Sequence, residues 1–225
     1  WETRGHKDRV IRIDLTALET IHSLSEEETV PVEEARFIQP FSSTMLEVFE
    51  QLALSPKVGA VLVDQNGDPS WQMSPHWNET ASQNDGTIER KTAFRPVAQM
   101  VIQGPLFYVG NPLYKTPRRN SRKNSDYDVI DLNSIPDDYF PRTNYGPAVP
   151  TDEYRRRMTK CRWEPAKSHG DFFRLAFRNM MQPSSERSLM GAIIPPGVSH
   201  VHTVESIACR ADQALLNLAS ISGSL

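Results

Sequence analysis

The chain has 225 residues, of which 38% are hydrophobic and 24% charged, with a formal net charge of −3. This composition is typical of a polar, soluble globular protein with one large domain or two small ones. It excludes a membrane-spanning protein, since no apolar run approaches the roughly 18 residues of a membrane helix.

The cysteines and the chain ends give two further expectations. Cys161 and Cys209 are too few for a disulfide framework, and neither has a Cys or His neighbour at zinc-ligand spacing. We expect both to be free thiols in a reducing cytoplasm. The chain starts at Trp1 without a signal-peptide pattern and ends within an apolar helical stretch, so we expect a fragment of a longer protein.

Charge is distributed unevenly along the chain. Residues 114–187 hold 15 Lys and Arg against 10 Asp and Glu, a net +5, so the remainder carries −8. A basic middle flanked by acidic segments suggests a polyanionic partner for the middle. An unevenly charged, solvated surface is the alternative.

The first 64 residues contain three periodic segments. Residues 9–24 begin with strand-like alternation and continue with helical spacing, and an exposed acidic loop follows at 25–29. Ser42 or Ser43 is expected to cap a helix. A buried strand is predicted at 58–64. The apolar face of the capped helix is predicted to hold Met45, Leu46, Phe49, Leu52 and Ala53.

Turn signals dominate the next stretch. Asn66–Gly67 predicts a tight turn after the strand. Residues 69–90 are aromatic and rich in turn formers, which predicts a long loop.

Strands and basic segments follow in the second half. We expect strands at 98–114, a basic loop at 115–125, a short strand and turn at 126–136 and an extended connection at 137–150. A basic helix or strand is expected at 152–163, a strand or helix at 170–181, a strand at 188–195, and a strand followed by a helix at 204–222. The inner face of that last helix is predicted to hold Ala214, Leu215, Leu218 and Ile221.

These elements predict an α+β fold, with mixed sheets, flanking helices and long proline-rich loops, since 17 prolines imply many extended connections. We divide the chain into an acidic N-terminal α/β portion with the aromatic loop, 1–95, and a basic portion, 96–225.

Three motifs match catalytic or metal sites weakly. "GNPLY" at 110–114 is near the Asn-Pro-Pro-Tyr motif of amino methyltransferases, but Leu113 replaces the second proline and no glycine-rich cofactor loop precedes it. A strand-terminating turn is expected there. His200 and His202 would face one side of a strand, but no third ligand is evident, so no metal site is expected. A metal-dependent nuclease would use Asp68, Glu89 and Lys91.

Clustered cations give the strongest signal. Five of them lie in the loop "YKTPRRNSRKN", where they can neutralise phosphates, and its asparagines can hydrogen-bond base edges. Two later segments, "PRTNYG" and "YRRRMTKCR", add further cations and a polar residue. The predicted DNA-contacting residues are Lys115, Arg118, Arg119, Asn120, Arg122, Lys123, Arg142, Asn144, Arg155, Arg156, Arg157 and Lys160, with Asn124 as a further base-contacting candidate.

The order of motifs after residue 90 resembles large bacterial type IIG-like restriction-modification enzymes, in which an adenine-specific DNA methyltransferase and its DNA-recognition region share one chain. The resemblance rests on "FRLAFRNMMQPSSERSLMGAIIPPGVSHVHTVES", with "GPLFYVGNPLYKTPR" and "DYFPRTNY" as supporting segments. Within it, Arg174, Arg178, Glu186 and Arg187 are expected to form a structural polar network, with Arg174 or Arg178 paired to Glu186 or Asp171. The strand containing "GAIIP" is expected to be the platform that displays the basic loops.

The resemblance implies a target-recognition region that positions duplex DNA for adenine methylation by a methyltransferase domain elsewhere in a bacterial cytoplasmic protein. S-adenosylmethionine would belong to that protein, as would magnesium if the protein also cleaves DNA. This segment itself is expected to hold no cofactor and no catalytic residue. Trp71, Trp77 and Tyr145 would support DNA distorted by base flipping. A protein-docking module of the same defence system is the alternative.

Overall fold

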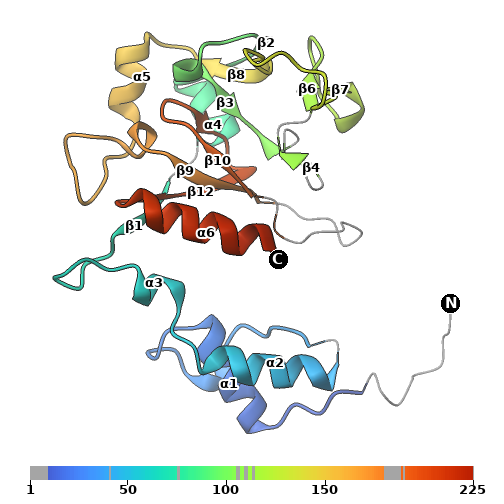
Figure 1. Cartoon of the computed structure of the whole chain (residues 1–225), viewed down its shortest axis with the longest axis vertical. Coiled ribbons are helices and arrows are strands. Elements are labelled where there is room, and N and C mark those ends of the chain that lie inside the picture. Colours follow the sequence, from blue (N-terminus) through green and yellow to red (C-terminus); the bar gives the residue numbers. More distant parts are fainter. Residues whose placement is uncertain are drawn as a thin grey trace, which may run out of the picture. The chain divides into compact units, whose positions relative to one another are not determined.

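The computed structural model describes residues 10–40, 42–74, 77–104, 107–108, 111–112, 115–179, 189 and 191–224. Contacts divide the chain into an N-terminal unit, Trp1–Leu62, and a C-terminal unit, Val63–Leu225 (Figure 1). The boundary predicted from the sequence follows Arg95, but in the structure this residue lies between two strands of one sheet. Within the ranges given, none of the helices has both the length and the apolar character needed to cross a membrane.

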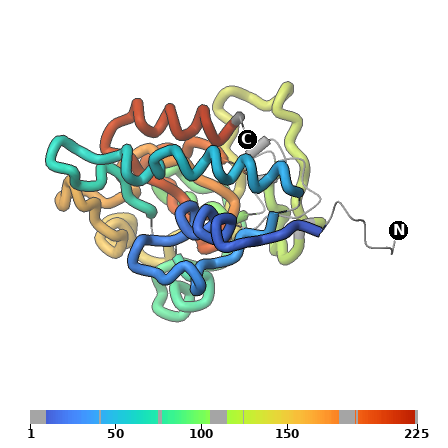
Figure 2. Tube along the Cα trace, turned by 90° about the horizontal axis from the view of Figure 1, so that it is seen from below, coloured from blue at the N-terminus to red at the C-terminus, as the bar shows by residue number. Residues whose placement is uncertain are grey.

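Two capped helices lie side by side in the N-terminal unit (Figure 2). The Asp14 side chain accepts a hydrogen bond from the amide of Ala17 at 3.0 Å and begins α1 (Leu15–Ser25). Ser42 caps α2 (Ser43–Ala53) in the same way, which confirms the predicted cap. Residues 10–14 form no strand, contrary to the expectation.

The helices bury a small core. Ile21 of α1 is 0% exposed and Phe49 of α2 is 7% exposed. Leu52, predicted on the same inner face as Phe49, is 53% exposed, so the apolar stripe of α2 is only partly covered.

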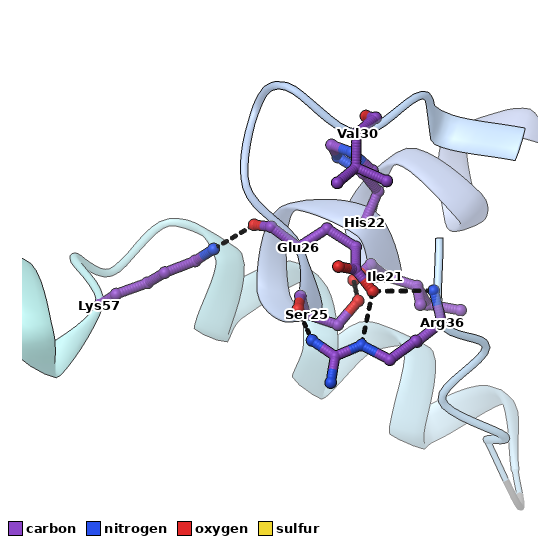
Figure 3. Close-up of polar contacts among 7 residues, drawn as sticks. All are labelled: Ile21, His22, Ser25, Glu26, Val30, Arg36 and Lys57. Atoms are coloured by element: carbon purple, nitrogen blue, oxygen red, sulfur yellow. Dashed lines mark hydrogen bonds and ion pairs between the residues drawn. The ribbon is translucent and has the colours of Figure 1, made fainter. Parts of the chain in front are cut away.

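A polar cluster ties α1 to the segments that follow it (Figure 3). Arg36 donates to the Glu26 carboxylate through Nε at 2.7 Å and through its amide at 3.0 Å, and its Nη2 donates to the Ser25 carbonyl. The hydrogen bond from the Arg36 side chain is the main reason that the pKa of Glu26 is lowered. Lys57 donates to the Glu26 carbonyl at 2.6 Å. Glu26 is therefore held at the end of α1, whereas Glu27, Glu28 and Thr29 are exposed, as expected for the acidic loop. The single turn η2 (Val32–Glu34) follows the loop.

The predicted strand at 58–64 is wrong. The apolar run instead forms α3 (Val58–Val61), and Val63 makes an isolated bridge to Pro69. A short apolar run without alternation does not distinguish strand from helix, and no neighbouring strand pairs with it. The predicted turn is confirmed: Gly67 has φ +84°, and the Asp64 carboxylate accepts from the amide of Asn66 at 2.8 Å.

The described part of the C-terminal unit contains two four-stranded sheets and two short hairpins. The first sheet is antiparallel, in the order β1 (Trp71–Ser74), β12 (Val204–Cys209), β9 (Arg174–Arg178), β10 (Gly191–Ile194). The second has the order β11 (Ser199–His200), β3 (Val101–Ile102), β8 (Thr143–Pro147), β2 (Ile88–Ala93), with β11 parallel to β3. Helices with mixed sheets confirm the predicted α+β fold.

Successive side chains of β9 point to opposite faces of the sheet and pack in two different hydrophobic clusters. Leu175 packs with Leu215 of α6 (Asp212–Ser224), which covers the first sheet (Figure 1). Ala176 contributes instead to a cluster shared by both sheets, which also contains Met100, Ile102, Tyr127, Ile194, Val198 and Val204. The strand and helix predicted at 204–222 are confirmed, although Ile221 is 56% exposed rather than on the inner face.

A third core lies under α5 (Thr151–Arg157), so the ambiguous segment from 152 begins as a helix. Tyr154 and Met158 pack with Val101, Tyr145 and Val201. The long loop predicted at 69–90 is wrong, because that segment contains β1, α4 (Glu79–Asn84) and the start of β2. The strand β1 is defined by its pairing with the distant β12, which runs from Trp71 opposite Cys209 to Ser74 opposite Ser206.

The remaining elements are short. β4 (Phe107–Tyr108) pairs with β5 (Asn111–Pro112), and β6 (Lys115–Pro117) pairs with β7 (Tyr127–Val129). Single 3-10 turns are η3 (Val97–Gln99), η5 (Asn124–Asp126) and η6 (His169–Asp171).

Candidate nucleic-acid interface

The predicted basic loop is a hairpin, here called the basic hairpin, residues 115–129. Its strands β6 and β7 pair Lys115 with Val129 and Pro117 with Tyr127. In the turn, Asn120 has φ +61°, a conformation that asparagine tolerates better than most residues.

Two side chains inside the turn hold it in shape. The Asp126 carboxylate accepts from the amides of Arg122 at 2.9 Å and Lys123 at 3.2 Å, and these bonds lower its pKa. The Ser121 hydroxyl, 2% exposed, lies 2.6 Å from the Arg118 carbonyl and 2.8 Å from the Asp126 carbonyl. The turn is therefore internally bonded.

A buried polar network anchors the hairpin to the second sheet. Asn144 of β8 donates to the Tyr127 hydroxyl at 2.9 Å and accepts from the Thr92 hydroxyl at 2.7 Å. Gln103 also donates to the Tyr127 hydroxyl. Burial raises the pKa of Tyr127 to about 12, so its hydroxyl stays protonated at neutral pH.

This network corrects two sequence expectations. Asn144 is 2% exposed and both ends of its amide are bonded, so it positions the hairpin and does not face a ligand. Tyr145 is also 2% exposed, and its hydroxyl donates to Glu79 at 3.0 Å. Burial, and next the nearby Glu79 charge, raise the pKa of Tyr145 to about 12. Its ring is core and not a surface for stacking DNA.

Cations of the hairpin differ in how far carboxylates neutralise them. Asp128 pairs with Arg118 at 2.7 Å and with Arg142 at 3.5 Å. Arg142 also lies over the Phe94 ring, 5.6 Å from its centroid. Arg119 and Arg122 are exposed, and no carboxylate of the described residues lies within 4.0 Å of either one.

The second predicted group of cations is separate from the hairpin. Arg157 pairs with Glu153 at 2.5 Å and with Asp85 at 4.0 Å, and Arg156 donates to the Asp152 carbonyl. Lys160 donates to the Ala166 carbonyl at 3.5 Å. Figure 1 shows α5 and the basic hairpin at opposite ends of the C-terminal unit. The predicted cations of α5 and those of the basic hairpin therefore lie on separate elements of the unit.

A polar cavity of about 530 Å³ opens between β2 and the hairpin turn. Arg90 reaches across it, with Nη2 donating to the Ser121 carbonyl at 2.7 Å. Local pattern gave no reason to select Arg90, because its neighbours in "TIERKT" are polar and its partner lies 31 residues away. The cavity is lined by Arg90, Thr92, Asn120, Ser121 and Arg122.

The expected polar network around the resemblance motif is partly described. Arg174 is 0% exposed and donates through Nη2 to the Val198 carbonyl, while its Nε and Nη1 have no partner in the structure. Burial lowers its pKa to about 10. Asp171 bonds Ser168 instead of forming an ion pair with Arg174. Arg178 ends β9.

Several residues singled out from the sequence lie outside the described ranges. They are Glu186 and Arg187 of the polar network, and Gly110, Leu113 and Tyr114 of the "GNPLY" motif. The platform hypothesis concerns β10, whose Ile194 shares a core with Tyr127 of the hairpin.

Of the residues of the nuclease alternative, Glu89 is held in an ion pair and Asp68 lies in a turn. Glu89 pairs with Arg95 at 3.5 Å, and Asp68 lies in the turn closed by the Asp64 carboxylate. No group of three or more His, Cys, Asp or Glu side chains suited to a metal occurs in the part of the chain that the structure describes. His200 is 1% exposed and bonds the Ser206 hydroxyl at 2.7 Å.

Other predicted surface groups are buried or partly buried. Trp77 donates to the Tyr154 hydroxyl at 2.6 Å, and Trp71 packs against the α6 core. Both cysteines are free thiols, as expected, and burial raises the pKa of Cys161 to about 11. Comparison of the chain with protein-family models, with curated proteins and with solved structures finds no match.

Proposed function

We propose that the C-terminal unit binds duplex DNA through the basic hairpin, as the target-recognition region of a restriction-modification methyltransferase. The observation that carries the proposal is an internally bonded hairpin on which, among the described residues, the Arg119 and Arg122 side chains form no ion pair. The link to adenine methylation rests on the motif resemblance. S-adenosylmethionine, and magnesium for any cleavage, would be bound by the methyltransferase domain that the resemblance implies and not by this unit.

Rigidity favours this use of the cations. A ligand must order flexible side chains and loops when it binds, and a turn already fixed by Asp126 and Ser121 reduces that entropic cost. Guanidinium groups match phosphate geometry and supply most of the non-specific affinity for DNA. Asn120 lies between them in sequence and is exposed, so its amide can reach base edges.

Among the described residues, the charge of Arg157 on α5 is neutralised by carboxylates, unlike the charges of Arg119 and Arg122 on the hairpin. Arg157 has two carboxylates within 4.0 Å, so its field is already screened. We therefore assign Arg157 to the structural surface, and we leave the rest of α5 out of the DNA contact because the helix lies apart from the basic hairpin (Figure 1).

Two triple variants with the same charge change test the proposal. Arg119→Gln/Arg122→Gln/Lys123→Gln should lower duplex affinity by roughly 100-fold at low salt, and lower the slope of log K against log salt by about 2 to 3, since each phosphate contact contributes about 0.9. The matched control, Arg155→Gln/Arg156→Gln/Lys160→Gln, should change affinity by less than about 3-fold.

Fluorescence anisotropy at several salt concentrations measures both quantities. A flat salt response of the unmodified protein, no binding at low salt, or equal losses in the two triple variants would reject the proposal.

Protein docking is the second candidate, and an apolar groove of about 590 Å³ beside the hairpin favours it. Phe94 is 67% exposed and Phe140 46% exposed at its walls, with Pro96, Pro136 and Tyr139. Phe94→Ser/Phe140→Ser should leave DNA binding unchanged if the groove docks a protein domain, such as the methyltransferase. If this variant lost as much DNA affinity as the triple variant of the hairpin, the groove would have no docking function separate from DNA binding.

A further inference from the structure

We propose that the cavity between β2 and the hairpin turn is a specific site for one nucleotide phosphate, with Arg90 and Arg122 as its ligands. The inference deepens the proposed DNA binding and, in that form, rests on it. Arg90 and Arg122 would make a fixed contact with the phosphate, whereas the other cations of the hairpin would contribute only long-range electrostatic attraction to DNA.

The lining has the composition of an anion site. Among the described residues that line it are two arginines, two hydroxyl residues and an asparagine, and none of these carries a carboxylate. Arg90 and Arg122 approach from different elements, β2 and the turn, so only the folded unit brings them together. Two guanidiniums that line one cavity can contact different oxygens of the same phosphate.

Arg90 is oriented and still has donors to spare. Among the described residues its guanidinium makes one hydrogen bond, from Nη2 to the Ser121 carbonyl, and it lies 5.8 Å from the centroid of the Tyr145 ring. A guanidinium has five N–H donors, so most remain for a ligand. Fixing one nitrogen holds the others in place before the ligand arrives.

The other walls are equally constrained. Thr92 is held by Asn144, Ser121 is buried, and Asn120 adopts positive φ. Asp126, the nearest carboxylate in the turn, is bonded to the amides of Arg122 and Lys123, and it is not part of the lining. A preformed polar cavity of this size falls within the range of small-ligand sites, so a nucleoside attached to the phosphate can be accommodated.

The phosphate could belong to an internal position of a DNA strand or to a free nucleotide, and three probes distinguish the sources. The full chain is titrated with inorganic phosphate, with dAMP, and with a duplex lacking 5′ phosphates. We expect dAMP to bind and to compete with the duplex.

Single substitutions then locate the contact. Arg122→Gln should weaken both dAMP and duplex binding at least about 10-fold, whereas Arg119→Gln, in the same turn but outside the lining, should weaken dAMP binding less than about 2-fold. Arg90→Gln should match Arg122→Gln. Arg90 also anchors the turn, so the Arg90→Gln measurement is accompanied by Arg90→Lys and by thermal unfolding curves of both variants. If Arg90→Lys is folded and still loses dAMP binding, the site is supported, because lysine lacks the planar fork of arginine.

Failure of the site and failure of DNA binding are distinguishable. Equal losses from Arg119→Gln and Arg122→Gln, or no binding of dAMP and phosphate, overturn the site even if the duplex binds. Binding of dAMP that depends on Arg90 and Arg122, without duplex binding, upholds the site and rejects the proposed function. Uptake of dAMP without competition by the duplex assigns the site to free nucleotides.

Discussion

At the residue scale, the interior of the C-terminal unit holds a charged and a neutral base close together. Arg174 is 0% exposed and His169 is 4% exposed. Burial, and next the charge of Arg174, lower the pKa of His169 to about 4. His169 also contacts the Thr159 carbonyl through Nδ1 at 3.1 Å, where the neutral ring donates. The folded state therefore favours neutral imidazole.

This predicts a pH-dependent stability. With a folded pKa near 4 and an unfolded value near 6.5, stability is greatest above pH 6.5 and is lost as the pH falls towards 4, by up to about 3 kcal/mol. His169→Asn keeps a donor for Thr159 but does not titrate, so its unfolding free energy should vary less between pH 7 and pH 4.5. Urea unfolding at both pH values measures the unfolding free energies. An equal change in unfolding free energy between the two pH values for the unmodified protein and for His169→Asn would contradict the proposed role of His169.

At the element scale, the basic hairpin depends on a negative residue. Asp126 bonds two amides of the turn, yet its charge lies among the cations that we propose bind DNA. Electrostatics alone predicts that removing this charge strengthens DNA binding. The hydrogen bonds predict the opposite, because an unpinned turn must be ordered when DNA binds.

We expect the hydrogen bonds to dominate. Asp126→Ala should weaken duplex binding about 3- to 10-fold although it makes the hairpin more positive. Asp128→Ala is the matched control, since Asp128 pairs with Arg118 and Arg142 and bonds no amide of the turn; it should strengthen binding. Anisotropy titrations at one salt concentration compare the two, and tighter binding by Asp126→Ala would show that turn rigidity is unimportant.

At the scale of the whole molecule, the two units have unequal cores. Among the described residues of the N-terminal unit, the buried apolar ones are Ile21, Pro40 and Phe49, whereas the C-terminal unit has three packed clusters. Stability follows buried apolar area, so the N-terminal unit should unfold first.

Limited proteolysis of the full chain tests this difference. Early cleavage is expected between Leu54 and Leu62, leaving a resistant product that begins near Val63. Glu26→Ala, which removes the carboxylate that holds Arg36, should accelerate that cleavage and leave the resistant product unchanged. Early cleavage within residues 143–179 would contradict the order of unfolding.

Much of the local structure was predictable because its signals lie within a few residues. The Ser42 cap, the Asn66–Gly67 turn and the strand and helix over 204–222 were found from spacing alone. The 69–90 segment was misread because β1 exists only through its pairing with β12, which lies more than 130 residues away. The roles of Asn144 and Tyr145 were misread for the same reason: nothing in "RTNYG" shows that it is a central strand.

The sequence by itself determined the fold class and concentrated cations in residues 115–123, because periodicity and composition are local properties. Tertiary structure alone decided which of those cations have carboxylates nearby, that α5 lies apart from the hairpin, and that Arg90 and Arg122 line one cavity. The physical reason is that the field at a side chain depends on the charges a few ångströms away, and in this unit those neighbours come from segments distant in the chain.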